Sequence, residues 1–523
     1  MDVVVGLDSG TTATKAVASG ATGEIRAGTS VAYPMLVPAP GYAELDATRL
    51  REAAVVALRD VARMVEQRGD RVVAVCLGAA MHGVVPMDAA GAPAGPVITW
   101  ADGRAAAEAR ELKSRSNGAL AKRLHHRTGT PVHPMSPLLK LMYLTARDRA
   151  AVRATPRWGG VKELIAGGLC GCGYLTDLSS ASSTGMYDIT GNRWDSEALE
   201  LAGVRPDQLA EVVPTTAVLG RLRPEIVAAT RLPPEAVVVA GATDGVLANL
   251  GVGAVTPDVG AVSLGTSGAL RAVRHKPRVD DAGRLFCYAL TEDRWVLGGA
   301  VNNGGSAVRW ASGALAPPAP RRAAGGDDAD GRDERLTEEA ATAPVGSGGL
   351  LCLPYLLGER APWWEPGLRG AYIGLRRDHT RAHLVRAVIE GVCQQLALVR
   401  DALTASDVPV REIRATGGAV ASELWVATLA SALNLPVRIA ESPEGTALGA
   451  CLLGHHALGA IGSLDDAASI IGVREPVEPD PSAADTYLRM RPLVERSTLL
   501  LTEVFHELDA FAQTPTGATP EVP

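Results

Sequence analysis

The stretch VVVGLDSGTTATK, residues 3–15, decides the fold of this chain. Residues 3–7 have the continuous apolar character of a buried strand, and residues 15–18 predict a second strand. Between them, Gly10 allows the backbone to approach a ligand closely. The stretch therefore predicts a hairpin with a polar turn that contains glycine.

This polar turn has a second copy half a chain later. Gly10-Thr11-Thr12 recurs as Gly265-Thr266-Ser267, 255 residues further on, and each copy lies between two predicted strands. Two copies at this distance predict a duplicated α/β domain rather than a solenoid. The 523 residues are also too many for one compact core, so two domains are expected.

Composition excludes several classes of protein. Lys and Arg number 51 against 58 Asp and Glu, and without a large basic block a nucleic-acid partner is not expected. The seven cysteines form no CxxC pair, which argues against structural zinc or a disulfide framework. The most apolar long window, residues 236–255, is interrupted by Asp244 and Asn249, and no signal peptide precedes it. We therefore predict a cytoplasmic protein that does not span a membrane.

Apolar periodicity predicts the remaining main elements. Strands are expected at residues 72–77, 97–100, 237–240, 261–264 and 413–416, and helices near 47–66, 103–115, 138–152, 381–404, 422–433 and 446–458. The composition of residues 312–347 predicts a surface loop or poorly ordered insertion, and the last ten or so residues are expected to be disordered.

The two polar turns carry groups that can hold phosphate. Thr11 and Thr12 offer hydroxyls and N–H groups, and Lys15 adds a cation. Asp8 stands where a carboxylate could hold a hydrated Mg²⁺. The alternative is an ordinary hairpin with polar turn residues. The copy Gly265-Thr266-Ser267 has the same interpretation with fewer supporting groups.

Two further candidates lie at the ends of predicted strands. Gly417 and Gly418 precede a helix, where a ligand could lie against the backbone, or they form a simple turn. Asp244 follows a buried strand, at the sheet edge where α/β proteins bind ligands. Its carboxylate could accept a proton from a substrate hydroxyl, or it could cap a helix.

Met81-His82-Gly83 follows the strand at 72–77. His82 could hydrogen-bond a polyol, although a lone histidine can equally be structural. The sequence contains no GxxxxGK[ST], GxGxxG, HExxH or GxSxG motif, so any ATP must be bound without a P-loop.

Taken in order, these motifs resemble the FGGY carbohydrate kinases of the sugar kinase, Hsp70 and actin superfamily. Residues 358–375 are similar to the signature region of that family. The resemblance implies an α/β fold with two actin-like (ribonuclease H-like) lobes and a ligand cleft between them. Residues 1–246 would form the sugar-binding lobe with the first phosphate motif, and 247–480 the nucleotide-binding lobe. Residues 481–523 would form a C-terminal helix and a disordered tail.

Within the family, residues 99–102, 128–137, 299–305 and 358–364 are most similar to kinases that act on gluconate. This implies a phosphotransferase with an alcohol acceptor, which moves the ATP γ-phosphoryl group to the terminal hydroxyl of D-gluconate and forms 6-phosphogluconate. Xylulose or another pentulose or polyol is the alternative substrate. A homodimer is a family-level expectation.

The resemblance also implies a role for each site residue. Asp244 would be the catalytic base, and Asp8 would hold Mg²⁺ through water. Substrate would contact Asp244 together with Met81, His82, Asn302 and Asn303. ATP would contact Thr11, Thr12, Lys15, Gly265, Thr266, Ser267, Gly417, Gly418 and Ser422.

A substrate carboxylate would need a cation, for which Lys162 and Arg104 are candidates, with a solvated surface position as the alternative for both. Two other functions stay open on this fold: a non-catalytic sugar-responsive regulator, and an actin- or Hsp70-like ATPase that drives a partner. The regulator would be favoured by loss of Asp8 or Asp244, and both are present.

Overall fold

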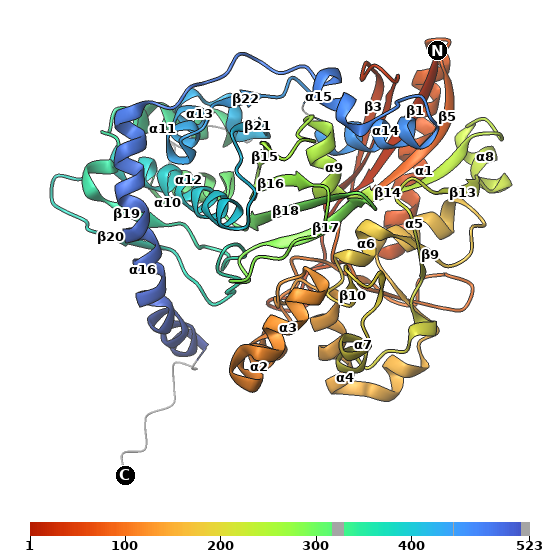
Figure 1. The fold of residues 1–523 in the computed structure, drawn as a ribbon, viewed down its shortest axis with the longest axis horizontal. Coiled ribbons are helices and arrows are strands. Elements are labelled where there is room, and N and C mark those ends of the chain that lie inside the picture. The colour runs from red at the N-terminus through yellow and green to blue at the C-terminus, as the bar shows by residue number, and fades with distance from the viewer. Residues whose placement is uncertain (316–328, 443, 514–523) are drawn as a thin grey trace, which may run out of the picture.

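The computed structural model describes residues 1–315, 329–442 and 444–513, which fold into two α/β lobes (Figure 1). Each lobe is built on a six-stranded mixed sheet, so the predicted duplication is confirmed. The N-terminal half of the chain forms one lobe and most of the C-terminal half forms the other (Figure 1).

The N-terminal sheet has the strand order β13-β14-β5-β1-β2-β3. Its strands are β1 (Asp2–Ser9), β2 (Ala13–Ser19), β3 (Ile25–Ala32), β5 (Arg71–Ala79), β13 (Val218–Arg221) and β14 (Val237–Thr243). β1 and β2 form the antiparallel hairpin predicted from the opening stretch, and β5 adds to β1 in parallel. β14 then pairs in parallel with β5, so β1, β5 and β14 all end at the same edge.

The C-terminal sheet repeats this pattern with the order β17-β18-β16-β15-β21-β22. Its strands are β15 (Val259–Leu264), β16 (Gly268–Arg274), β17 (Phe286–Thr291), β18 (Arg294–Val301), β21 (Glu412–Thr416) and β22 (Val437–Ile439). β15 and β16 are the second hairpin, and β21 adds to β15 in parallel. The two glycine-containing turns therefore occupy equivalent places in the two lobes.

Two helices cover opposite faces of the N-terminal sheet. α1 (Ala47–Gln67) packs on the face that carries Val3, Val5 and Leu7, and the Asp46 carboxylate caps its N-terminus. α14 (Gly445–Ala457) comes from the second half of the chain, yet it packs on the opposite face. A Cβ at Gly6 would lie 2.0 Å from the Ala447 carbonyl oxygen, so glycine is required for this close approach.

The other main helices complete the two lobes. They are α2 (Ala106–Ser114), α3 (Ala119–Thr128), α4 (Pro137–Ala154), α5 (Val161–Leu169), α7 (Ser196–Ala202), α9 (Asp244–Gly251), α10 (Gly305–Leu315), α11 (Ala329–Ala341), α12 (Arg381–Ala405), α13 (Glu423–Leu433) and α16 (Pro481–Gln513). Among the described residues, α12 alone has the length and apolarity of a membrane span, but 89% of its most apolar window is buried inside the protein. It is therefore placed as a core helix.

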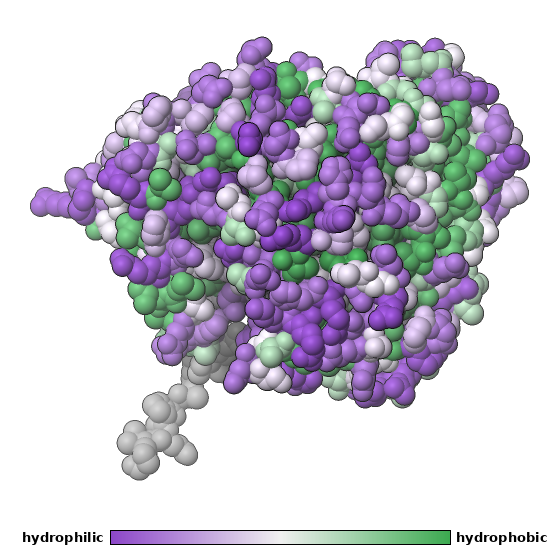
Figure 2. Space-filling model, viewed as in Figure 1, coloured by the Kyte–Doolittle hydropathy of each residue, from purple (hydrophilic) through white to green (hydrophobic). Residues whose placement is uncertain are grey.

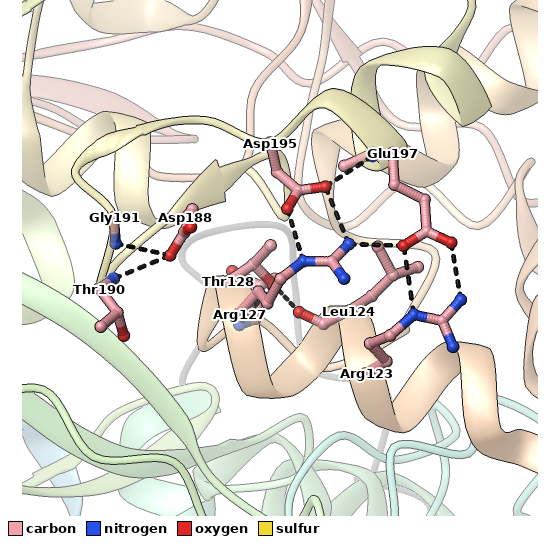
Figure 3. A network of polar contacts seen from close by, with 11 residues as sticks. Arg123, Leu124, Arg127, Thr128, Asp188, Thr190, Gly191, Asp195 and Glu197 are labelled. Atoms are coloured by element: carbon pink, nitrogen blue, oxygen red, sulfur yellow. Dashed lines mark hydrogen bonds and ion pairs between the residues drawn. The ribbon is translucent and has the colours of Figure 1, made fainter.

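An ion-pair network fixes α3 against α7 (Figure 3). The Arg127 guanidinium contacts Asp195 at 2.6 Å and Glu197 at 2.7 Å, and Arg123 contacts Glu197 at 2.7 Å. Asp195 also caps α7 through the Ala198 N–H. This network holds the end of α3, where the segment 129–136 begins.

The expected insertion at 312–347 is only partly a loop. α10 extends to Leu315, α11 covers residues 329–341, and a short 3₁₀ turn begins at Ser347. Residues 316–328 and the predicted disordered tail at 514–523 lie outside the described residues. The face drawn in Figure 2 is mainly hydrophilic, with hydrophobic residues scattered among polar ones.

Candidate active site

Asp8 and Asp244 come together at the carboxyl edge of the N-terminal sheet. Asp8 is in register with Gly78 of β5, and Ala242 of β14 is in register with the same glycine. Asp244 follows two residues after Ala242, as the first residue of α9. Three parallel strand ends thus place two carboxylates at one edge, the usual ligand position in α/β sheets.

Asp8 is poised for a positively charged ligand. Its Oδ1 is buried and has no hydrogen-bond partner among the described residues. Burial and then the Asp244 charge raise the pKa of Asp8 to about 7, and the Lys15 charge opposes the rise. The Lys15 Nζ lies 2.9 Å from Glu444 Oε2, at the start of α14. The buried Asp8 Oδ1 therefore needs a proton or a cation as its partner.

Asp244 is held in one orientation by backbone donors. Its Oδ1 accepts the Gly245 N–H at 2.8 Å and the Met81 N–H at 3.4 Å. Burial raises the pKa of this carboxyl group, whereas the Gly245 N–H and then the Arg271 charge oppose the rise. The N-cap of α9 is Thr243, so Asp244 is not the capping residue that the alternative interpretation required. Among the described residues, no group donates to Asp244 Oδ2, which leaves it available to a substrate hydroxyl.

The donors at this edge suit magnesium chemistry. Mg²⁺ prefers oxygen ligands and keeps several waters, so one or two carboxylates and substrate phosphates suffice. Asp8 with an unpartnered buried oxygen, beside Asp244, fits that requirement. Within the described residues, no group of three or more His, Cys, Asp or Glu side chains could enclose a metal by itself.

The second turn opens into a cavity of about 880 Å³ between the C-terminal sheet and its helices. Four predicted ATP-binding residues line it: Gly265, Thr266, Gly418 and Ser422. Most of the other lining residues come from α10, α11 and α13 and include Arg309 and Trp425. The Gly305 N–H, at the start of α10, donates to the Gly265 carbonyl at 2.7 Å and fixes the turn.

Four other predicted ATP-binding residues belong to these turns without lining the cavity. Gly417 has φ +110°, and a Cβ there would lie 2.5 Å from the Leu264 carbonyl oxygen, so only glycine fits. Ser267 closes its turn by accepting the Gly265 N–H on its carbonyl at 3.0 Å. In the first turn, the Thr11 hydroxyl accepts the indole N–H of Trp100 at 3.2 Å. Thr12 follows it in that turn and is exposed.

His82 is buried and held rigidly, three residues after the end of β5. Its Nδ1 lies 2.8 Å from the Ser183 carbonyl oxygen, and its own carbonyl accepts Lys140 Nζ at 2.6 Å. Burial and then the Lys140 charge lower the pKa of His82 to about 3, so the ring is neutral. Its neighbour Met81 reaches toward Gly245. A Cβ added at Gly245 would lie 2.6 Å from the Met81 methyl carbon. The neutral ring suits hydrogen bonding rather than ion pairing.

Asn302 and Asn303 both form hydrogen bonds with residues 357–359. Asn303 is fully buried and its amide donates to the Gly358 carbonyl and to Glu359 Oε2 at 3.0 and 2.9 Å. Asn302 donates its backbone N–H to Glu359 Oε1 and its amide to the Leu357 carbonyl. The structure thus gives both side chains an intramolecular role, and contact with substrate stays a prediction.

The sequence analysis missed two buried arginines at this site. Arg271 on β16 and Arg360 both act on the Asp244 carboxyl group. The Arg360 guanidinium lies 4.7 Å from the ring centroid of Trp100, which comes from the other lobe. Arg360 stands in the quoted 358–364 segment, but nothing local in the sequence indicates its proximity to Asp244.

Both cations suggested for a substrate carboxylate have other partners, and their expected surface position is wrong. The Lys162 Nζ is buried and donates to the carbonyls of Leu77, Ala240 and Ala242. Arg104 is also largely buried, where it bonds Asp102 and Glu44. They stabilise the protein rather than meet the solvent.

Comparison with known proteins agrees with this geometry. The family described as "FGGY family of carbohydrate kinases" matches with its N-terminal domain at residues 3–251 and its C-terminal domain at residues 260–458. The chain is 39% identical over 509 residues to a gluconokinase of Bacillus subtilis (strain 168), covering 97% of each.

Solved structures give the same fold. A gluconate kinase from Lactobacillus acidophilus superimposes with a TM-score of 0.89 at 30% identity, covering 97% of this chain and 99% of that one. A ligand-bound xylulose kinase from the same organism also gives 0.89 at 30%, covering 97% and 100%. The two structures confirm the two-lobed fold, but their equal similarity does not distinguish gluconate from xylulose as the substrate.

Proposed function

Because the chain belongs to the FGGY family of carbohydrate kinases, we propose that it transfers the γ-phosphoryl group of ATP to the terminal hydroxyl of D-gluconate. The observation that carries this choice of sugar is the 39% identity, over nearly the whole chain, to a protein named gluconokinase. Xylulose is the second candidate, since a xylulose kinase structure is equally similar in fold.

Asp244 acts as the base in this proposal. Two backbone N–H groups hold Oδ1, so Oδ2 can accept the proton of the substrate hydroxyl as phosphorus–oxygen bond formation proceeds. Burial raises the pKa of this carboxyl group, which strengthens it as a base once ionised. The positive charges of Arg271 and Arg360 oppose that rise in pKa and favour the ionised form of Asp244.

The remaining residues position ATP. The cavity lined by Thr266, Gly418 and Ser422 is large enough for a nucleotide and supplies hydroxyl and backbone donors. Thr11, Thr12 and Lys15 would approach the phosphates from the opposite lobe. Phosphoryl transfer depends mainly on such positioning and on charge stabilisation. Closure of the lobes would exclude water, which otherwise competes as acceptor.

Asp8, through water, would hold Mg²⁺ beside these phosphates. When bound, the ion would neutralise negative charge on the phosphates. The protein's own contribution is a buried carboxylate oxygen with no internal partner, next to the base. Cytoplasmic location and a homodimer stay predictions.

A coupled ADP-release assay with Mg·ATP tests the proposal against D-gluconate, D-xylulose, L-ribulose, glycerol, D-glucose and no sugar. Turnover with gluconate alone is the expected result. Turnover with xylulose instead would keep the fold and the role of Asp244 but replace the substrate. Absence of sugar-dependent turnover would favour the non-catalytic regulator, and sugar-independent ATP hydrolysis would favour an ATPase that drives a partner.

A further inference from the structure

We propose that His133 and Arg360 form the subsite that binds the carboxylate of the substrate. The inference rests on the proposed function, because only an open-chain sugar acid brings a carboxylate to this site. It assigns the binding role that neither Lys162 nor Arg104 can fill.

His133 presents a buried donor with no acceptor. Its Nδ1 accepts the Met135 N–H at 3.2 Å, so in the neutral ring the proton is on Nε2. The side chain is 7% exposed, and Nε2 is buried without a partner among the described residues. Such buried unpaired groups are rare in native proteins and call for a missing partner. Here that partner has to be a hydrogen-bond acceptor.

Arg360 presents a second buried donor of the same kind. One Nη2 bond, to the Val301 carbonyl at 3.1 Å, and stacking on Trp100 hold the guanidinium in place. Its Nε is buried and has no partner in the described part of the chain. Two fixed N–H groups without acceptors match the two oxygens of a carboxylate.

The charges around these two donors favour an anion over water. Burial, and then Lys113, Arg360, His82 and Lys140, lower the pKa of His133 well below its usual value. Lys113 donates to the Trp364 carbonyl, and Lys140 donates to the carbonyls of His82 and Met135. No carboxylate in the described part of the chain accepts a hydrogen bond from Lys113 or Lys140, although Glu365 acts on Lys113 and Asp102 on Lys140 as opposite charges. Both lysines act on the His133 ring as positive charges.

The nearby carboxylates leave the subsite free. Glu359 adjoins Arg360, but its oxygens accept from Asn302 and Asn303. Asp244 acts on Arg360 as an opposite charge and is the proposed base at the reacting hydroxyl. A substrate with a hydroxyl at Asp244 and an anionic group at His133 has the chemistry of an open-chain sugar acid.

The two donors come from different parts of the chain that meet at this point. His133 lies in segment 129–136, whose start is held by the α3–α7 network (Figure 3). Its ring contacts Trp364 edge-on, with centroids 5.9 Å apart, just beyond Arg360. The Gly129 carbonyl accepts the Cys287 N–H at 2.8 Å and joins this segment to the C-terminal lobe. Apposition of the lobes thus completes the subsite.

The test compares D-gluconate with D-gluconamide, which has the same carbon chain and no charge. The wild-type enzyme is expected to prefer gluconate, in kcat/KM, by at least about a hundredfold. In His133→Asn and Arg360→Met this preference for gluconate over gluconamide should fall at least about tenfold, through a raised KM for gluconate. His133→Asn keeps an acceptor for Met135, and His133→Gln should restore part of the preference by returning a donor near Nε2.

Controls and contrary outcomes separate this inference from the proposed function. His126→Asn and Arg377→Met should keep the wild-type preference, because His126 faces Asp281 at 3.7 Å and Arg377 is exposed. ATP affinity and the thermal midpoint show whether each variant is folded. If a variant does not fold, the dissociation constants of the wild-type enzyme for D-gluconate and D-gluconamide are compared instead. Equal constants would overturn the carboxylate subsite. Gluconate turnover with an unchanged preference in the variants overturns the subsite alone, whereas no wild-type gluconate turnover overturns both proposals.

Discussion

Asp8 and Asp244 stand on either side of strand β5, at the same edge of the N-terminal sheet. Gly78 lies between them, and a Cβ there would be 3.4 Å from Asp8 Oδ1 and 3.1 Å from Leu247 Cδ1. The two carboxyl groups are therefore separated by a residue without a side chain, and the Asp244 charge adds to burial in raising the pKa of Asp8 to about 7.

This relationship predicts a pH-dependent cost in stability. The folded pKa of Asp8 is above its unfolded value near 3.9, so its protonated form stabilises the fold at low pH, and that stability is lost as the pH rises to about 7. Asp8→Asn in the metal-free enzyme should therefore gain thermal stability over the wild type between about pH 5 and pH 8. Thermal midpoints across that range measure it, and a difference that does not change with pH would contradict the raised pKa.

Asp244→Asn tests the proposed base. The amide keeps the shape and the backbone contacts at Oδ1 but cannot take the proton from the substrate hydroxyl. We expect kcat to fall at least about a hundredfold while KM for the sugar changes much less. Asp258→Asn, which alters an exposed aspartate of the C-terminal lobe, is the matched control. Near-normal turnover by the Asp244 variant would show that another group, or none, accepts the proton.

Thr266→Val tests the second phosphate turn. Valine keeps the branched shape but removes the hydroxyl donor from the cavity wall. The dissociation constant for ATP, measured by calorimetry without sugar, should rise by about five- to tenfold, the usual effect of one lost hydrogen bond. Thr404→Val, on the exposed part of α12, should leave it unchanged. Equal nucleotide affinity in the Thr266 variant and the wild type would argue against this turn as a phosphate site.

Lys162 shows where local sequence reasoning fails. Nothing in the sequence marks Lys162 as buried, but three carbonyls near strand ends accept from it and Asp177 lies 3.3 Å away. Lys162→Met should lower the free energy of unfolding by about 3–5 kcal/mol, because it leaves Asp177 buried without its partner. Urea unfolding measures this, with Lys122→Met on the surface as the control. A loss as small as that of the control would mean that the buried pair contributes little.

The elements and motifs that sequence could predict are local ones. The opening hairpin, Asp46 at the start of α1 and the strand before Asp244 follow from short patterns of apolar and capping residues. The equivalence of the two turns followed from their repeated residues.

The residues that sequence could not place depend on contacts between distant segments. Arg360 reaches Trp100 only because the two lobes meet, and 260 positions separate them in the chain. His133 carries no signal beyond its motif, since its unpaired Nε2 results from packing. Asn303 is directed toward Glu359 for the same reason, which no spacing in the sequence indicates.

Close packing of α9 against α14 links Asp244, the proposed base, to the other half of the chain. A Cβ at Gly449 would lie 2.1 Å from the Leu247 carbonyl oxygen, and one at Gly251 would lie 1.6 Å from the Gly445 carbonyl oxygen. α9 begins at Asp244, so separating these helices would move the base as well as weaken the fold.

Gly449→Ala is therefore expected to lower both stability and kcat. The added methyl group meets backbone rather than a flexible side chain, so the helices must move apart, at a cost of about 1–3 kcal/mol. Thermal unfolding and the coupled assay measure the two effects. Gly313→Ala is the matched control, because this exposed helical glycine has open space around it and alanine should be neutral or stabilising by up to about 1 kcal/mol. If both variants unfold at the wild-type midpoint with wild-type kcat, then α9 and α14 can separate without moving Asp244, and the contact has no part in holding the base.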